Sequence, residues 1–187
     1  MVSFNVSQLL LLGPGAVREF DFCEPLPDPA TELHLHGPIS GRARLMRTNE
    51  GILAHADYRA GVDLECGRCL EPTVVDVEGE LDEEFLPTTD VRTGLPVHVP
   101  GAEDTDQPLI DEHHEINLDE VLRQNILTGL PLQPLCAPDC PGLCPECGER
   151  LGQRHAVHAE SQPEMTPLNP ASPFARLAVL LHDEDER

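Results

Sequence analysis

Apolar and polar residues alternate strictly in the middle of the chain. From Tyr58 to Cys66 every second residue is apolar, and the residues between them are charged or glycine. After Cys69 a similar alternation runs from Thr73 to Leu81. A period of two residues places one set of side chains on a buried face of a sheet. We therefore predict two long strands, joined by a turn that contains Cys66 and Cys69.

A third strand is predicted before this pair. Leu33 and Leu35 alternate with polar residues, and Ala43 and Leu45 continue the alternation. Glycine and proline residues between the two parts indicate a bend or bulge. Residues 48–51, Thr-Asn-Glu-Gly, are typical of a hairpin turn. The pattern predicts three long antiparallel strands in a meander, which could curl toward a barrel.

The segment 87–112 has no sustained hydrophobic period. It holds four prolines and several acidic residues. A segment of this composition has few apolar side chains to bury. We predict a flexible acidic loop.

A helix is predicted over residues 117–129. Asn117 is a suitable N-cap, and Glu120, three residues later, completes a variant of the capping box. Gly129 followed by Pro131 ends the helix. We expect the helix to cover one face of the sheet with an apolar stripe, which consists of Leu118, Val121, Leu122 and Ile126.

These elements give an α+β chain that is mainly β. We expect residues 1–130 to form a β-rich domain that includes the acidic loop and the covering helix. Residues 131–160 are a cysteine-rich segment with the composition of a zinc knuckle. Residues 161–187 are predicted to be an extension with a short helix and an acidic tail.

The charge of the chain is strongly negative. It has 34 acidic residues against 12 basic residues, all of them arginine, and a formal net charge of −22. Residues 71–187 alone hold 25 acidic residues and six arginines. Binding to a phosphate backbone usually needs clustered positive charge, and the chain offers only the small group of Arg42, Arg44 and Arg47. The charge therefore favours a basic partner, and the alternative is that it only keeps the protein soluble and monomeric.

The N-terminal sequence predicts no export signal, because it lacks a basic region and its apolar run from Leu9 to Leu12 is short. No apolar segment approaches the roughly 20 residues of a membrane span. We expect a cytoplasmic protein without a membrane partner. In that reducing compartment, clustered cysteines indicate metal or thiol chemistry before disulfides.

Six of the seven cysteines fall into motifs with the spacing of zinc ligands. Cys66 and Cys69 form one C-x-x-C motif, and Cys144 and Cys147 form another. Two intervening residues let both thiolates converge on one structural zinc ion. The second motif is the stronger, because the glycine after Cys147 permits the left-handed turn of a zinc knuckle.

The sequence leaves the complete ligand set open. Cys136 and Cys140 could complete a local four-cysteine site with the second motif. The first motif could instead supply the other knuckle of a zinc ribbon. His155 and His158 are alternative ligands further along the chain.

No catalytic constellation stands out in the sequence. It contains no phosphate-binding loop, dinucleotide fingerprint or nucleophile elbow. A thiol oxidoreductase would need a reactive cysteine at a helix N-terminus, whereas Cys66 and Cys69 are predicted to join two strands. We expect a protein that is not an enzyme and that has no small-molecule substrate.

Three segments in combination carry a resemblance to a known family. They run from Leu64 to Pro72, from Ile116 to Cys136 and from Cys140 to Gly148. With these segments the chain resembles the YceD family of large-subunit ribosomal RNA accumulation proteins. Many relatives have a cysteine pair where this chain has its two downstream histidines.

The resemblance implies a role in ribosome biogenesis. The implied partners are the precursor of the large ribosomal subunit, ribosomal RNA or a basic ribosomal protein, and the negative charge favours the protein. The alternative is a zinc-ribbon regulator that binds nucleic acid. Such a regulator would present four arginines on one face, which are Arg42, Arg44, Arg47 and Arg68.

Overall fold

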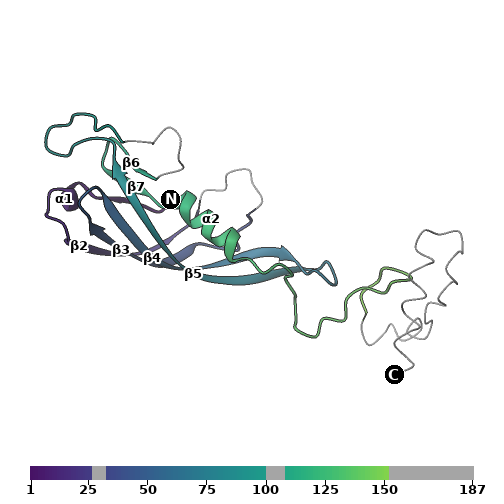
Figure 1. Cartoon of the computed structure of the whole chain (residues 1–187). Helices are drawn as coiled ribbons and strands as arrows, with labels where there is room; N and C mark the ends of the chain where they lie inside the picture. Colours follow the sequence, from purple (N-terminus) through teal and green to yellow (C-terminus); the bar gives the residue numbers. More distant parts are fainter. Residues whose placement is uncertain (27–32, 100–107, 152–187) are drawn as a thin grey trace, which may run out of the picture. The chain divides into compact units, whose positions relative to one another are not determined.

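The computed structural model describes residues 1–26, 33–99 and 108–151. The chain divides into two compact units, of which the first spans residues 1–140 and the second begins at Pro141. The predicted C-terminal helix and acidic tail lie outside the described residues. Figure 1 traces the elements, which are β1 (Ser3–Asn5), α1 (Ser7–Leu10), β2 (Val17–Glu24), β3 (Ile39–Arg47), β4 (Ile52–Glu65), β5 (Pro72–Pro87), β6 (Leu109–Ile110), β7 (Glu115–Asn117) and α2 (Asp119–Gly129).

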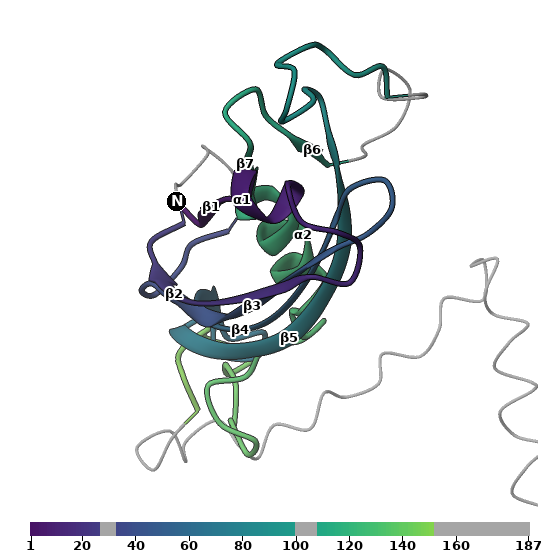
Figure 2. The ribbon, with the colours of Figure 1, turned by 90° about the vertical axis from the view of Figure 1, so that its left-hand side faces the viewer.

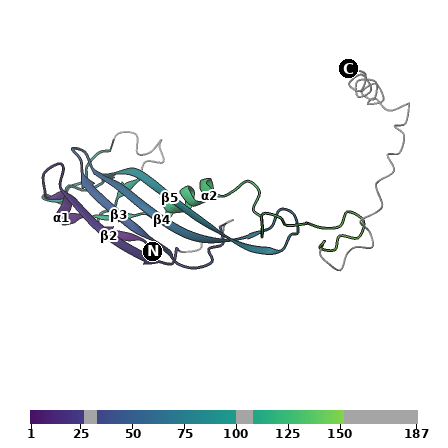
Figure 3. The same cartoon turned by 90° about the horizontal axis from the view of Figure 1, so that it is seen from below.

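Three antiparallel strands form the centre of the first unit, and this confirms the predicted meander. β3 pairs with β4, and β4 pairs with β5 along its whole length. Thr48 orders the β3–β4 turn, because its hydroxyl accepts hydrogen bonds from the backbone N–H groups of Glu50 and Gly51. Figure 3 shows the strands side by side.

Two further strands extend the sheet to the order β2-β3-β4-β5-β6. β2 pairs antiparallel with β3, and β6 pairs in parallel with β5, inside the segment predicted to be a loop. The strand predicted to run from Leu33 to Leu45 is β3, and it begins only at Ile39. Leu35 makes no more than an isolated bridge with Val62. The sheet is open, and the suggested barrel is wrong. A barrel would need hydrogen bonds between β2 and β6, whereas these strands form the two edges.

Helix α2 begins at Asp119, two residues after the predicted start, and ends at Gly129 as predicted. The N-cap is Leu118 and not the predicted Asn117, although the Asn117 side chain accepts a hydrogen bond from the Asp119 backbone N–H at 2.8 Å. The second half of the capping box does not form. The Glu120 carboxylate accepts hydrogen bonds from Arg123 and Gln124 instead, because a guanidinium one turn along offers a charge-assisted bond.

The core lies between the concave face of the sheet and α2. Figure 2 shows the sheet curving around the helix, with α1 near the same side. Leu118, Leu122 and Ile126 are fully buried, and Val121 packs at the border of the core, which confirms the predicted stripe. Burial of each large apolar side chain contributes about 1.5–3 kcal/mol before entropic costs.

One part of the sheet extends beyond this core. β3 pairs with β4 only as far as Arg59, while β4 and β5 stay paired as far as Glu65 and Pro72. Ala60, Val62 and Val77 are still buried in the core, so we call only the end of this strand pair, residues 63–65 and 72–74, the ribbon. Two-stranded structures are marginally stable in water, so the ribbon needs support from elsewhere.

Candidate metal centre

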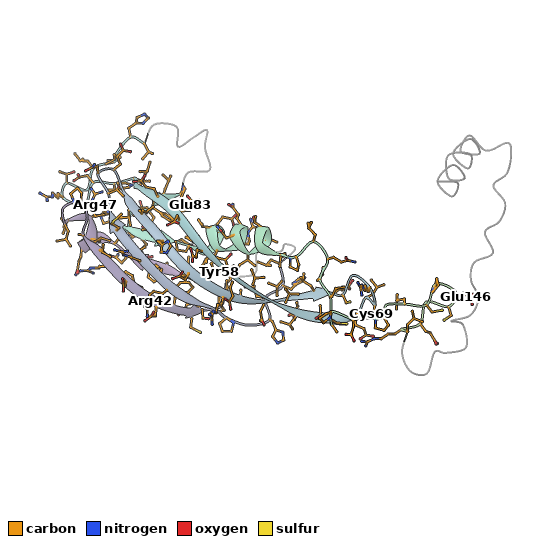
Figure 4. The ribbon with its side chains drawn as sticks, turned by 60° about the horizontal axis from the view of Figure 1, so that its bottom comes forward. Arg42, Arg47, Tyr58, Cys69, Glu83 and Glu146 are labelled. Carbon is orange, nitrogen blue, oxygen red and sulfur yellow. The ribbon has the colours of Figure 1, made fainter. Side chains whose placement is uncertain are left out.

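The turn at the end of the ribbon has the backbone of a metal-binding knuckle. The Cys66 N–H donates to the Glu71 carbonyl at 2.9 Å, and the Leu70 N–H donates to the Cys66 carbonyl at 2.9 Å. Leu70 has a φ of 59°, the left-handed conformation that such a turn requires. Figure 4 labels Cys69 in this turn. The turn brings the two cysteines of the first motif together.

A second pair of cysteines arrives from the segment that follows α2. The Gly67 N–H donates to the Pro134 carbonyl at 2.8 Å, and the Arg68 guanidinium donates to the Cys140 carbonyl at 3.0 Å. These bonds hold the segment against the turn. Cys136 and Cys140 therefore lie beside the first motif, although about 70 residues separate the two pairs.

The four sulfur atoms have the spacing of a tetrahedral metal site. The Sγ atoms of Cys66 and Cys140 lie 3.8 Å apart, and those of Cys69 and Cys136 lie 3.6 Å apart. All four lie within 4.8 Å of one another. Tetrahedral coordination with Zn–S bonds of about 2.3 Å places sulfurs about 3.8 Å apart. The four cysteines could therefore hold a metal ion, and we call them the cysteine quartet.

The sulfur atom of Cys66 is surrounded by hydrogen-bond donors. Backbone N–H groups of Cys136, Arg68 and Cys69 lower the pKa of the Cys66 thiol to about 6. The pKa of the Cys136 thiol is shifted in the opposite direction. Hydrogen bonding with the Cys140 and Cys69 sulfurs raises its pKa to about 12. Donors that favour a thiolate also favour metal coordination, because the thiolate is the form that binds metal.

The quartet is the one set of three or more close metal-ligating side chains in residues 1–26, 33–99 and 108–151. It combines the first C-x-x-C motif with Cys136 and Cys140. The sequence had offered Cys136 and Cys140 as partners of the second motif, and the first motif as the other knuckle of a zinc ribbon. Cys144 and Cys147 lie in the second unit. His155 and His158 lie outside the described residues. Within the quartet, the spacing of Cys136 and Cys140 was the weaker signal, since three residues separate them.

Cys144 and Cys147 form a pair of their own in the second unit. Backbone N–H groups of Cys147 and Glu146 lower the pKa of the Cys144 thiol. Cys144 is buried and Cys147 is exposed. Gly148, the residue after Cys147, has a φ of 72°, so this motif has the left-handed turn that the sequence predicts for a knuckle.

The four arginines of the alternative interpretation do not share a face. Arg42 and Arg44 point away from the core on β3, and Arg42 pairs with Asp21 at 2.8 Å. Arg47 lies on the opposite face of β3 by strand alternation, and its guanidinium donates to the Gly51 carbonyl in the β3–β4 turn. Arg68 lies in the knuckle beside the quartet.

The outer face of β5 carries a row of exposed carboxylates. Val77 and Leu81 are buried against the core, so the alternate residues point outward. Arg59 and His55 on β4 each contact one carboxylate of the row. We call the row the acidic row, and it consists of Asp76, Glu78, Glu80 and Asp82.

The acidic row continues onto the neighbouring strand. Asp57 is the cross-strand partner of Glu80 on the same face. Like charges placed directly opposite each other destabilise a sheet. Arg42 on β3 is the other cross-strand partner of Asp57, so the excess of negative charge lies on the β5 side of this face.

The fold and the site define a class of protein: a small, mainly β domain with an open sheet, one covering helix and a cysteine quartet suited to a metal ion. Neither helix within the described ranges has the length and apolar composition needed to cross a membrane. The family model for the large ribosomal RNA subunit accumulation protein YceD matches residues 54–181. The chain belongs to this family, and the match supports a ribosome-related role.

Curated relatives come from mycobacteria. The chain is 35% identical over 119 residues to an uncharacterized protein of Mycobacterium tuberculosis. The aligned region covers 60% of this chain and 53% of that protein. It is 31% identical over 117 residues to an uncharacterized protein of Mycobacterium leprae, covering 61% of this chain and 49% of that protein. The chain thus spans about half the length of these relatives. No solved structure gives a significant match.

Proposed function

We propose that this chain is a cytoplasmic, non-enzymatic assembly factor that supports accumulation of large-subunit ribosomal RNA by binding a basic ribosomal protein. Membership of the YceD family is the observation that carries the ribosomal role. The acidic row and the net charge of −22 support a basic protein as the direct partner.

The acidic row suits a partner with several lysines or arginines. Its carboxylates stand on alternate residues of one strand, and side chains at that spacing lie about 7 Å apart. The like-charged pair of Asp57 and Glu80 would be relieved by a cation between the two strands. Charge complementarity of this kind accelerates association more than it increases affinity.

We propose a structural zinc ion for the cysteine quartet. Bound zinc would contribute four strong bonds that join the end of the ribbon to the segment after α2. A redox role is the weaker candidate, because Cys66 and Cys69 are buried and a substrate disulfide needs access to a sulfur. The quartet also has four sulfur ligands, whereas hydrolytic zinc sites keep one position open.

Sucrose-gradient sedimentation tests the ribosomal role. Deletion of the gene is expected to reduce free and assembled large subunits relative to small subunits, and the tagged protein is expected in fractions that precede the mature large subunit. Complementation with the wild-type gene should restore the profile. A normal profile in the deletion strain, with the tagged protein confined to the top of the gradient, would refute the role.

Native purification tests the basic protein as partner. We expect the tagged chain to retain a basic ribosomal protein after ribonuclease treatment. The triple variant Asp76→Asn, Glu78→Gln and Glu80→Gln should lose it. A matched control removes the same charge from exposed residues elsewhere, with Glu50→Gln, Glu112→Gln and Glu115→Gln. Recovery of RNA without ribosomal protein, or equal loss in both variants, would contradict the proposal.

A further inference from the structure

A cavity lies between the first half of α2 and the strands β5 and β6. It has a volume of about 460 Å³, within the range of ligand pockets, which is about 300–1,000 Å³. The apolar part of its lining includes Phe85 on β5, Leu109 on β6 and Val121 on α2. We call this cavity the α2 pocket. Its apolar walls can contact the hydrocarbon part of a long side chain.

Glu83 brings a negative charge to the α2 pocket from an inward position of β5. Strand alternation places it on the same face as Leu81 and Phe85, which are both buried. Its cross-strand partner is Ala54, which is fully buried. Figure 4 labels Glu83 on β5. A half-buried carboxylate at such a position reduces stability unless a partner offsets its charge.

The other charged groups of the pocket are engaged elsewhere. The Arg123 guanidinium donates to the Glu120 carboxylate, and the Asp119 carboxylate accepts a hydrogen bond from the Val2 backbone N–H at 2.7 Å. Within the ranges that the structure describes, Glu83 has neither a hydrogen bond nor an ion pair. The lining holds three carboxylates and one guanidinium, so the pocket has an excess of negative charge.

We propose that the α2 pocket binds an arginine side chain of the basic partner, with the guanidinium at Glu83 and the apolar stem against Phe85 and Val121. A guanidinium pairs with a carboxylate through two parallel hydrogen bonds, and its weak hydration suits a half-buried site. Arginine also buries its methylene stem along apolar surface. One side chain therefore matches both the walls and the charge of the pocket.

The inference rests on the proposed basic partner, but it concerns a different surface from the acidic row. Glu83 lies on the inner face of β5, whereas the acidic row lies on the outer face of the same strand. Substitutions at one surface leave the side chains of the other unchanged. The two surfaces can therefore be tested separately.

Peptide binding to the full chain tests the pocket. The peptide Gly-Gly-Arg-Gly-Gly, with both ends blocked, should cause saturable NMR shifts of the amides of Glu83, Leu109 and Val121. Two control peptides carry citrulline, the neutral isostere of arginine, or leucine in its place, and both should bind about tenfold more weakly or less. Equal affinity for either control peptide would overturn the proposal, because the charge would then not be recognised.

Substitution of the carboxylate tests the assigned residue. Glu83→Gln should weaken binding of the arginine peptide about tenfold, whereas Glu50→Gln, at an exposed position outside the pocket, should not change it. Glu83→Gln should unfold at the same temperature as the wild type or higher, because it removes a half-buried charge. Unchanged binding by Glu83→Gln, or shifts confined to the acidic row, would overturn the proposal.

The peptide test and the native purification fail in different ways. If the arginine peptide does not bind the pocket but the tagged chain retains a basic ribosomal protein, the pocket assignment is wrong and the proposed function stands. If the peptide binds as expected but no ribosomal protein is retained, the pocket assignment stands and the proposed partner is wrong.

Discussion

Two regions of the first unit are stabilised by different forces. Around α2, fully buried apolar side chains such as Phe85, Leu122 and Ile126 hold the sheet to the helix. At the end of the ribbon, apolar side chains are exposed, with 60% of Leu70 and 44% of Val74 accessible to solvent. Four sulfur atoms lie there in place of a core. A chain that extends beyond its hydrophobic core needs another source of stability, and a metal site can supply it.

Zinc removal should produce the largest difference in stability between the two regions. Chelation, or the substitution Cys136→Ser, is expected to abolish protection from hydrogen exchange in the ribbon, because bound zinc would supply most of the stability there. Amides of β3 beside the core should keep their protection. Cys23→Ser is the control, because Cys23 is exposed and lies outside the quartet. Equal loss of protection in both regions would mean that they unfold as one unit.

A cavity in the core should destabilise the other region. Ile126→Ala is expected to lower the free energy of unfolding by about 2–5 kcal/mol, because the buried side chain leaves a cavity between α2 and the sheet. Chemical denaturation measures the change. Leu132→Ala, at a fully exposed side chain, should cost less than about 0.5 kcal/mol. Zinc content should stay the same in both variants, and zinc loss in the first would show that the core positions the quartet.

A substitution at the inner face of β5 should have an intermediate effect. A Cβ atom at Gly79 would lie 2.5 Å from the Tyr58 hydroxyl oxygen and 2.7 Å from the ring carbon that carries it. Gly79→Ala should therefore displace this buried ring and cost about 1–3 kcal/mol. The burial that raises the pKa of Tyr58 should decrease, so the tyrosine absorption should titrate at lower pH. Gly37→Ala has open space and is the control.

The smallest effect is expected at the surface of α2. Hydrogen bonds from Arg123 and Gln124 lower the pKa of Glu120 from 4.5 to about 2. The carboxylate therefore stabilises the fold above its ordinary pKa, and this contribution disappears as the pH falls through about 2. Its side chain is largely exposed, so Glu120→Gln should cost less than about 0.5 kcal/mol at pH 7. Chemical denaturation of the wild type and the variant across this pH range should give free energies of unfolding that converge in acid. A difference that grows as the pH falls would contradict the lowered pKa of Glu120.

Several features of the fold were predictable because they depend on short-range pattern. Alternation over residues 58–66 and 73–81 gave the two longest strands, and the stripe on α2 gave the face that it buries. β2 was missed, although Phe20 and Phe22 alternate with acidic residues. β6 was beyond prediction, since a pair of only two residues has no period of its own.

For the candidate site, the sequence determined which side chains have metal chemistry, and the tertiary structure decided which of them meet. The two C-x-x-C motifs are local, because two intervening residues and a left-handed turn are enough to join their cysteines. The meeting of Cys66 and Cys69 with Cys136 and Cys140 depends on the length of the ribbon and on where α2 ends against the sheet. Spacing along the chain carries no information about such a contact, because packing of the helix on the sheet brings together segments that are about 70 residues apart.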